Sequence, residues 1–206
     1  MNSRSVKRIE DVGLLRSIQF AEDAGPLAHP VRPISYMEIS NFYTTTIYEK
    51  GAEVVRMYQT LLGEDAFRQG TDLYFERHDG TAATTDDFAD AMAEAGQIDL
   101  AQFKRWYEQP GTPKVQVSEF YADGRLTLNI AQAPANLPNA QQQQPFHMPL
   151  AMGFLAPDGA SLTLSAADIE SAAATSLRDD GQTLLLGAKE STTELTISNL
   201  QAKPVV

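Results

Sequence analysis

The residue in this sequence best suited to chemistry is Tyr48. The pattern of apolar residues predicts that it lies at the opening turn of a helix, and two small residues, Gly51 and Ala52, follow one turn later. A phenol in that position could donate a hydrogen bond to an oxyanion as charge builds on a tetrahedral intermediate, and the local helix dipole would favour the same negative charge. The spacing alone also fits a tyrosine that merely packs on a helix surface.

The other side chains with catalytic or metal-binding chemistry do not form a complete site. None of the three histidines, His29, His78 and His147, begins a His-Glu-x-x-His pair, and no two lie one helical turn apart. We expect a structural role for His29 in its proline-rich loop, and we expect His78 to end a helix and His147 to start a strand. The sequence contains no Gly-x-Ser-x-Gly motif, no glycine-rich phosphate loop and no cysteine. We therefore expect this chain alone to bind neither a metal nor another cofactor.

The composition argues against some classes of binding partner. The 206 residues are 43% hydrophobic and 21% charged, as in an ordinary soluble globular protein. The net charge of −11 argues against nucleic acid as a partner, because the neutralisation of phosphates requires basic patches. The longest apolar runs, such as residues 184–186, are too short to cross a bilayer, and the amino terminus lacks the apolar core of a secretory signal. These features predict a cytoplasmic protein with no membrane partner.

Tyr48 belongs to a half of the chain in which apolar residues recur at helical spacing. The predicted helices cover residues 4–20, from 44–46 to Gly63, about 64–77, from Thr85 to Gly96, and from Asp99 to about Tyr107. In the helix that contains Tyr48, we expect a solvent-facing stripe made of Glu49, Lys50, Glu53 and Arg56. Helices joined by short loops indicate an all-α unit.

After Pro113 the spacing of apolar residues changes from the helical period to a period of two, which is typical of strands. Apolar and polar residues alternate in several short runs, and Asp-Gly pairs at 123–124, 158–159 and 180–181 predict turns between them. About six or seven strands in this half indicate an antiparallel β-sandwich, and residues 133–145 with their run of glutamines indicate a loop. We therefore predict an α+β protein with two consecutive units, an all-α part over residues 1–111 and a β-sandwich over residues 112–206.

Several motifs in the helical half resemble those of one enzyme family. The run Tyr48-Glu49-Lys50-Gly51-Ala52-Glu53-Val54-Val55-Arg56-Met57, preceded by Asn41-Phe42-Tyr43, resembles the alanyl aminopeptidase N family of zinc metallopeptidases. The other matching segments are Gln19–Ala24, Pro26–Pro33, Leu61–Glu64, Leu73–Gly80, Phe103–Tyr107 and Gly111–Pro113. They follow the family's order over residues 1 to about 117, whereas the β half matches more weakly.

This resemblance implies specific roles for two tyrosines. Tyr48 matches the tyrosine that hydrogen-bonds the tetrahedral intermediate beside the zinc, and Tyr43 matches a residue that lines the pocket for the first side chain of the substrate. The family's zinc ligands, His-Glu-x-x-His on one helix and a glutamate on the next, are absent, as is its Gly-x-Met-Glu-Asn strand for the substrate amine. The sequence is thus similar to a middle section of such an enzyme.

As such a section, the chain would consist of the end of a thermolysin-like catalytic domain followed by the β-sandwich. The full-length parent would use zinc and act on peptides. The partners of this section would be the remainder of the catalytic domain and a carboxy-terminal helical domain, and we expect the isolated chain to be inactive. Two alternatives stay open at this stage: a short protein that binds or scaffolds through its sandwich, and a β domain that binds a ligand such as carbohydrate. Upstream DNA that encodes His-Glu-x-x-His would favour the aminopeptidase.

Overall fold

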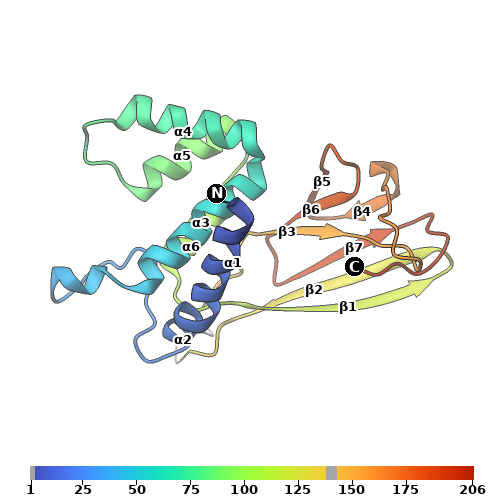
Figure 1. Ribbon diagram of the computed structural model, residues 1–206, viewed down its shortest axis with the longest axis horizontal. Helices are drawn as coiled ribbons and strands as arrows, with labels where there is room; N and C mark the ends of the chain where they lie inside the picture. Colours follow the sequence, from blue (N-terminus) through green and yellow to red (C-terminus); the bar gives the residue numbers. More distant parts are fainter. Residues whose placement is uncertain (1–2, 138–142) are drawn as a thin grey trace. The chain divides into compact units, whose positions relative to one another are not determined.

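The computed structural model describes residues 3–137 and 143–206, and the chain forms two compact units. The helical unit comprises residues 1–113 and 134–144, and the β unit comprises residues 114–133 and 145–206. Figure 1 shows the helices in the first half of the chain and the strands in the second. The predicted domain boundary after residue 111 stays a prediction.

The helical unit follows the predicted order of helices. Its α-helices are α1 (Arg4–Leu14), α2 (Phe20–Asp23), α3 (Gly51–Leu62), α4 (Glu64–His78), α5 (Thr85–Gly96) and α6 (Arg105–Glu108). Two π-helical turns interrupt this pattern, a first π-turn at Leu15–Gln19 and a second π-turn at Thr46–Lys50. Short 3₁₀ turns cover Ile39–Phe42 and Gln102–Lys104.

The helix predicted over residues 4–20 is present as α1, the first π-turn and α2, but part of its apolar stripe is not covered. The side chains of Val6 and Ile9 are 55% and 71% exposed, and Ile18 is exposed as well. The core of the helical unit instead centres on Tyr58 of α3, whose ring lies 4.4 Å from the ring of Phe103 and 5.6 Å from that of Phe88. The amphipathic pattern therefore predicted the helix without predicting what covers it.

Local signals set the ends of the helices. Gly63 ends α3 with a φ of +83°, a conformation that favours glycine. Thr84 begins α5 through a capping box, in which Asp87 N donates to Thr84 Oγ1 (3.2 Å) and Thr84 N donates to Asp87 Oδ2 (2.8 Å). The helix begins at Thr85, as predicted, but its cap is Thr84 and not Thr85, because the hydroxyl of Thr84 is the one that reaches the third amide of the helix.

Replacing Thr84 with alanine should lower the free energy of unfolding by about 1 kcal/mol, because one amide of the first turn of α5 loses its acceptor. Urea titration of the 206-residue chain measures this change. Thr85→Ala is the matched control, since the Thr85 hydroxyl accepts a bond from Arg32 Nη1 (3.1 Å) and caps no amide. A larger loss for Thr85→Ala than for Thr84→Ala would contradict this assignment of the cap.

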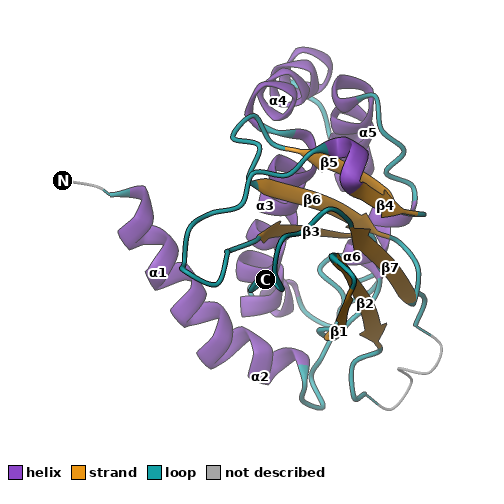
Figure 2. Ribbon diagram, turned by 90° about the vertical axis from the view of Figure 1, so that its right-hand side faces the viewer, coloured by secondary structure: helices purple, strands orange, loops and turns teal. Residues whose placement is uncertain are grey.

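The β unit contains two antiparallel sheets, so the predicted antiparallel β-sandwich is confirmed. Its strands are β1 (Lys114–Ala122), β2 (Arg125–Ala133), β3 (Met148–Gly153), β4 (Ile169–Ser171), β5 (Ala174–Leu177), β6 (Thr183–Ala188) and β7 (Thr192–Ile197). The order is β1-β2-β7-β4 in one sheet and β3-β6-β5 in the other, where Figure 2 shows β6 between its neighbours.

The core of the β unit comes from alternating residues of β2, β6 and β7, together with two residues outside the strands, Phe154 and Leu164. These residues are Leu126, Leu128, Ile130, Phe154, Leu164, Leu184, Leu186, Leu195 and Ile197. The predicted Asp123-Gly124 turn joins β1 to β2, and Ala122 pairs with Arg125 across it. Of the predicted loop over residues 133–145, residues 138–142 lie outside the described part of the chain. Every helix in residues 3–137 and 143–206 is too short or too polar to cross a membrane.

Candidate functional site: the Tyr48 turn

The structure places Tyr48 in the second π-turn, directly before α3. Single π-turns within helices occur frequently at functional sites. The side chain of Tyr48 is 57% exposed, and that of Tyr43 is 70% exposed. The two rings stack with their centroids 6.3 Å apart and their planes 28° from parallel. The structure thus brings the two predicted site residues together on one exposed surface of the helical unit.

The opposite side of the same turn is buried. Thr46 and Lys50 are 0% and 6% exposed, and they lie four residues apart, so their side chains share one face of the turn. Tyr48 lies midway between them in sequence and projects from the other face. This alternation fixes the direction of the phenol, because the turn cannot rotate without exposing Thr46 or Lys50.

Thr46 forms the first anchor of the turn. Its backbone N–H donates to Glu22 Oε1 at 2.8 Å, and its hydroxyl donates to the same oxygen. Gln19 Nε2 donates to Thr46 Oγ1 at 3.3 Å, and Gln19 is itself buried in the first π-turn. The two π-turns are therefore tied directly to each other through polar side chains.

Lys50 forms the second anchor, and its expected place on the solvent-facing stripe is wrong. Its ammonium donates to Asp23 Oδ2 (2.9 Å) and to the carbonyl oxygen of Gly111 (3.0 Å), and both bonds are buried. Burial lowers the pKa of Lys50 because it disfavours the charged ammonium, and the carboxylate of Asp23 offsets part of this effect. Helical periodicity alone could not reveal this position, because the partners of Lys50 lie 27 and 61 residues away in sequence.

Asp23 connects the Lys50 anchor to Gly111 and Thr112, near the end of the first segment of the helical unit. Besides the ammonium of Lys50, it accepts the backbone N–H of Gly111 at Oδ1 (2.7 Å) and the hydroxyl of Thr112 at Oδ2 (2.8 Å). Gly111 is buried with a φ of +85°, and a Cβ atom there would lie 2.4 Å from Cβ of Ala135. Residue 111 must therefore be glycine, because a side chain there would prevent the backbone from approaching Asp23 and Lys50.

The histidines do not join this site as metal ligands. His29 Nδ1 lies 2.8 Å from the carbonyl oxygen of Pro30, and its Nε2 lies 3.9 Å from Glu22 Oε1. His78 ends α4, as predicted, and His147 directly precedes β3. Within residues 3–137 and 143–206, no group of three or more histidine, aspartate or glutamate side chains is arranged to hold a metal ion.

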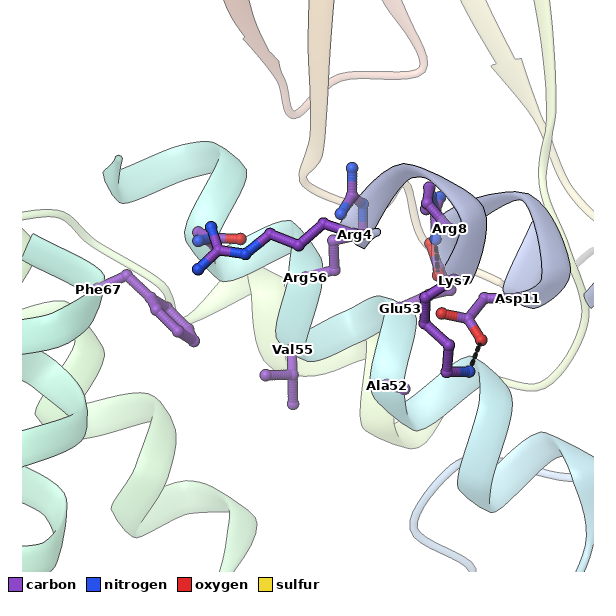
Figure 3. Close-up of a pocket in the computed structure, with 10 residues that line it drawn as sticks. Arg4, Lys7, Arg8, Asp11, Ala52, Glu53, Val55, Arg56 and Phe67 are labelled. Atoms are coloured by element: carbon purple, nitrogen blue, oxygen red, sulfur yellow. Dashed lines mark hydrogen bonds and ion pairs between the residues drawn. The ribbon is translucent and has the colours of Figure 1, made fainter. Parts of the chain in front are cut away.

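The structure also shows an open hollow of about 510 Å³ along α1, α3 and Phe67 of α4. Figure 3 shows its polar rim, where Lys7 pairs with Asp11 on α1 and Arg8 reaches across to Glu53 on α3. Arg8 Nη2 donates to Glu53 Oε2 at 3.0 Å, so this ion pair holds the two helices together. The sequence did not reveal this hollow, because its walls come from helices that are distant in sequence.

Comparison with known proteins gives two family matches. Residues 6–107 match the peptidase family M1 domain, and residues 111–206 match a domain of unknown function (DUF3458) with an Ig-like fold. The first match lies within the helical unit, and the second includes the whole β unit.

Curated relatives point in the same direction. Aminopeptidase N of Escherichia coli (strain K12) is 50% identical over 166 residues, which are 80% of this chain and 19% of that protein. Aminopeptidase N of Caulobacter vibrioides is 54% identical over 161 residues, which are 77% of this chain and 19% of that protein. The chain thus spans about a fifth of the length of these relatives.

A solved structure shows the same fold. It is the crystal structure of Legionella pneumophila aminopeptidase A in complex with aspartic acid, which matches with a TM-score of 0.64 and 22% identity. The match covers 85% of this chain and 18% of that one.

Proposed function

The chain belongs to peptidase family M1 through residues 6–107, and from this premise we propose that it is part of a longer zinc aminopeptidase that removes amino-terminal residues from peptides. The observation that carries the proposal is the Tyr48 turn, in which buried anchors on one face leave the phenol exposed on the other. A non-catalytic binding or scaffold protein built on the sandwich is not favoured, because the relatives with this helical half are aminopeptidases.

Tyr48 would act as a hydrogen-bond donor in this reaction. When water adds to the carbonyl carbon of the first peptide bond, negative charge develops on the carbonyl oxygen, and a phenol hydroxyl already in place stabilises that charge. The turn leads directly into α3, whose amino-terminal end adds a favourable dipole. Tyr43, stacked on Tyr48, would supply part of the wall around the first side chain of the substrate.

The described residues do not fit a zinc site, since they contain no suitable group of ligands. The zinc of the proposed enzyme would therefore be held by residues outside this chain. The same residues, together with further domains of the longer protein, would be the partners of this chain. We also propose a cytoplasmic location, which the cysteine-free composition supports.

The test uses the complete reading frame that contains this chain, expressed as one protein. We expect it to hydrolyse L-alanine p-nitroanilide, to lose this activity when a chelator removes the metal and to regain it with added zinc. The 206-residue chain alone, assayed with added zinc, should show no turnover, because it lacks the metal ligands. The proposal would be contradicted by a complete protein without zinc-dependent turnover, or by turnover from the pure 206-residue chain.

A further inference from the structure

We propose that Asp23 and Lys50 are positioning residues for Tyr48, and that their buried ion pair fixes the register of the second π-turn. This inference rests on the proposed function, because it assigns to both residues an effect on the reaction that acts through the phenol of Tyr48. Neither residue belongs to the exposed surface on which Tyr43 and Tyr48 lie, since Asp23 and Lys50 are 1% and 6% exposed.

The position of Lys50 in the turn links its ion pair to Tyr48. Lys50 is the last residue of the second π-turn, two residues after Tyr48. With Thr46 held by Glu22 and Lys50 held by Asp23, both ends of the turn are attached to the short segment from Glu22 to Asp23. The backbone of Tyr48 lies between these two attachments, so a change at either one alters where the hydroxyl points.

The buried bonds of Lys50 also restrict the helical register of the turn. A π-turn is a rare geometry, and a shift of register by one residue in a helix rotates each side chain by about 100° around the axis. Apolar anchors would tolerate such a shift, because hydrophobic contact is not directional. The ammonium of Lys50 has no such freedom, since both of its buried bonds require one position, at Asp23 Oδ2 and at the carbonyl oxygen of Gly111.

Asp23 itself cannot move independently. It is held by three donors on two separate segments: Lys50 Nζ on one side, and Gly111 N and Thr112 Oγ1 on the other. Because Gly111 is confined by Ala135, the segment that fixes Asp23 is itself fixed. The chain of contacts runs from Gly111 through Asp23 and Lys50 to the Tyr48 turn, and every link in it is buried.

A role limited to stability would predict a different kinetic result. Loss of stability alone reduces the fraction of active enzyme, and it does so by the same factor whether or not residue 48 carries a hydroxyl. A positioning role predicts that the loss disappears once the hydroxyl has been removed. Combining each anchor variant with Tyr48→Phe therefore separates the two roles.

The experiment measures kcat and KM of the complete protein with L-alanine p-nitroanilide, at a temperature where every variant is folded. Lys50→Met should lower kcat about 10- to 100-fold with KM within about twofold, because a small misplacement of a catalytic group has an effect of that size. In the Tyr48→Phe background the same change should lower kcat less than about twofold. Met92→Ala, a fully buried change in α5, is the control for loss of stability and should leave kcat within about twofold.

A milder variant covers the case in which Lys50→Met does not fold. It is the double variant Asp23→Asn with Lys50→Met, which removes the same ion pair but leaves no unpaired buried charge, and it should also lower kcat several-fold or more, again only when residue 48 is tyrosine. Equal losses in the two backgrounds, or unchanged kcat in both anchor variants of an active enzyme, would overturn the positioning role. A wild-type protein without aminopeptidase activity would instead overturn the proposed function, and this inference with it.

Discussion

Replacing Tyr48 with phenylalanine in the complete protein is expected to lower kcat for L-alanine p-nitroanilide about 100- to 1,000-fold. Loss of one oxyanion donor has an effect of this size, equivalent to about 3–4 kcal/mol of transition-state stabilisation. KM should change less than about threefold, because the hydrogen bond strengthens only as the carbonyl oxygen gains charge. The fold should be unaffected, since the side chain of Tyr48 is 57% exposed.

Tyr43→Phe is the matched control for this experiment. It removes a hydroxyl from the ring that stacks on Tyr48, on the same exposed surface, and it keeps the apolar wall that the ring provides. We expect kcat within about threefold of the wild-type value. If Tyr48→Phe retained nearly full kcat, or if Tyr43→Phe were equally damaging, the assignment of Tyr48 as the oxyanion donor would be wrong.

Replacing Lys50 with methionine in the 206-residue chain is expected to lower the free energy of unfolding by about 3–5 kcal/mol, as measured by urea titration. The change removes the cation and leaves the carboxylate of Asp23 buried with Gly111 N and Thr112 Oγ1 as its remaining donors. The double variant Asp23→Asn with Lys50→Met should recover much of this loss, because it leaves no unpaired buried charge. Additive losses in the double variant would contradict this account.

The stability difference between the wild type and Lys50→Met should also depend on pH. Burial lowers the pKa of Lys50 below its ordinary value of 10.5, so the unfolded chain binds the proton more tightly than the folded chain does. Between the lowered pKa and 10.5, the contribution of Lys50 to the free energy of unfolding therefore rises with pH. The advantage of the wild type over Lys50→Met should widen as the pH rises towards 10.5, and a narrowing difference would contradict the assigned direction.

The features that depend on near neighbours in the chain could be predicted from the sequence. Gly63 marked the end of α3 and Asp123-Gly124 marked the hairpin of β1 and β2, because these conformations are determined within a few residues. The sequence did not distinguish Thr84 from Thr85 as the cap of α5. Both are suitable cap residues, and the choice between them depends on backbone direction. The catalytic roles of Tyr48 and Tyr43 stay predictions.

The sequence by itself determined the helical half, the antiparallel β half, the absence of a local zinc motif and the turn that carries Tyr48. Only the tertiary structure decided which face of that turn is buried. Lys50 is charged and was grouped with Glu49, Glu53 and Arg56, so the prediction placed it in water. In the fold, Asp23 and Gly111 surround its ammonium from 27 and 61 residues away. Long-range pairing of charge overrides local periodicity here, because a buried carboxylate requires a cation more strongly than a helix requires a polar stripe.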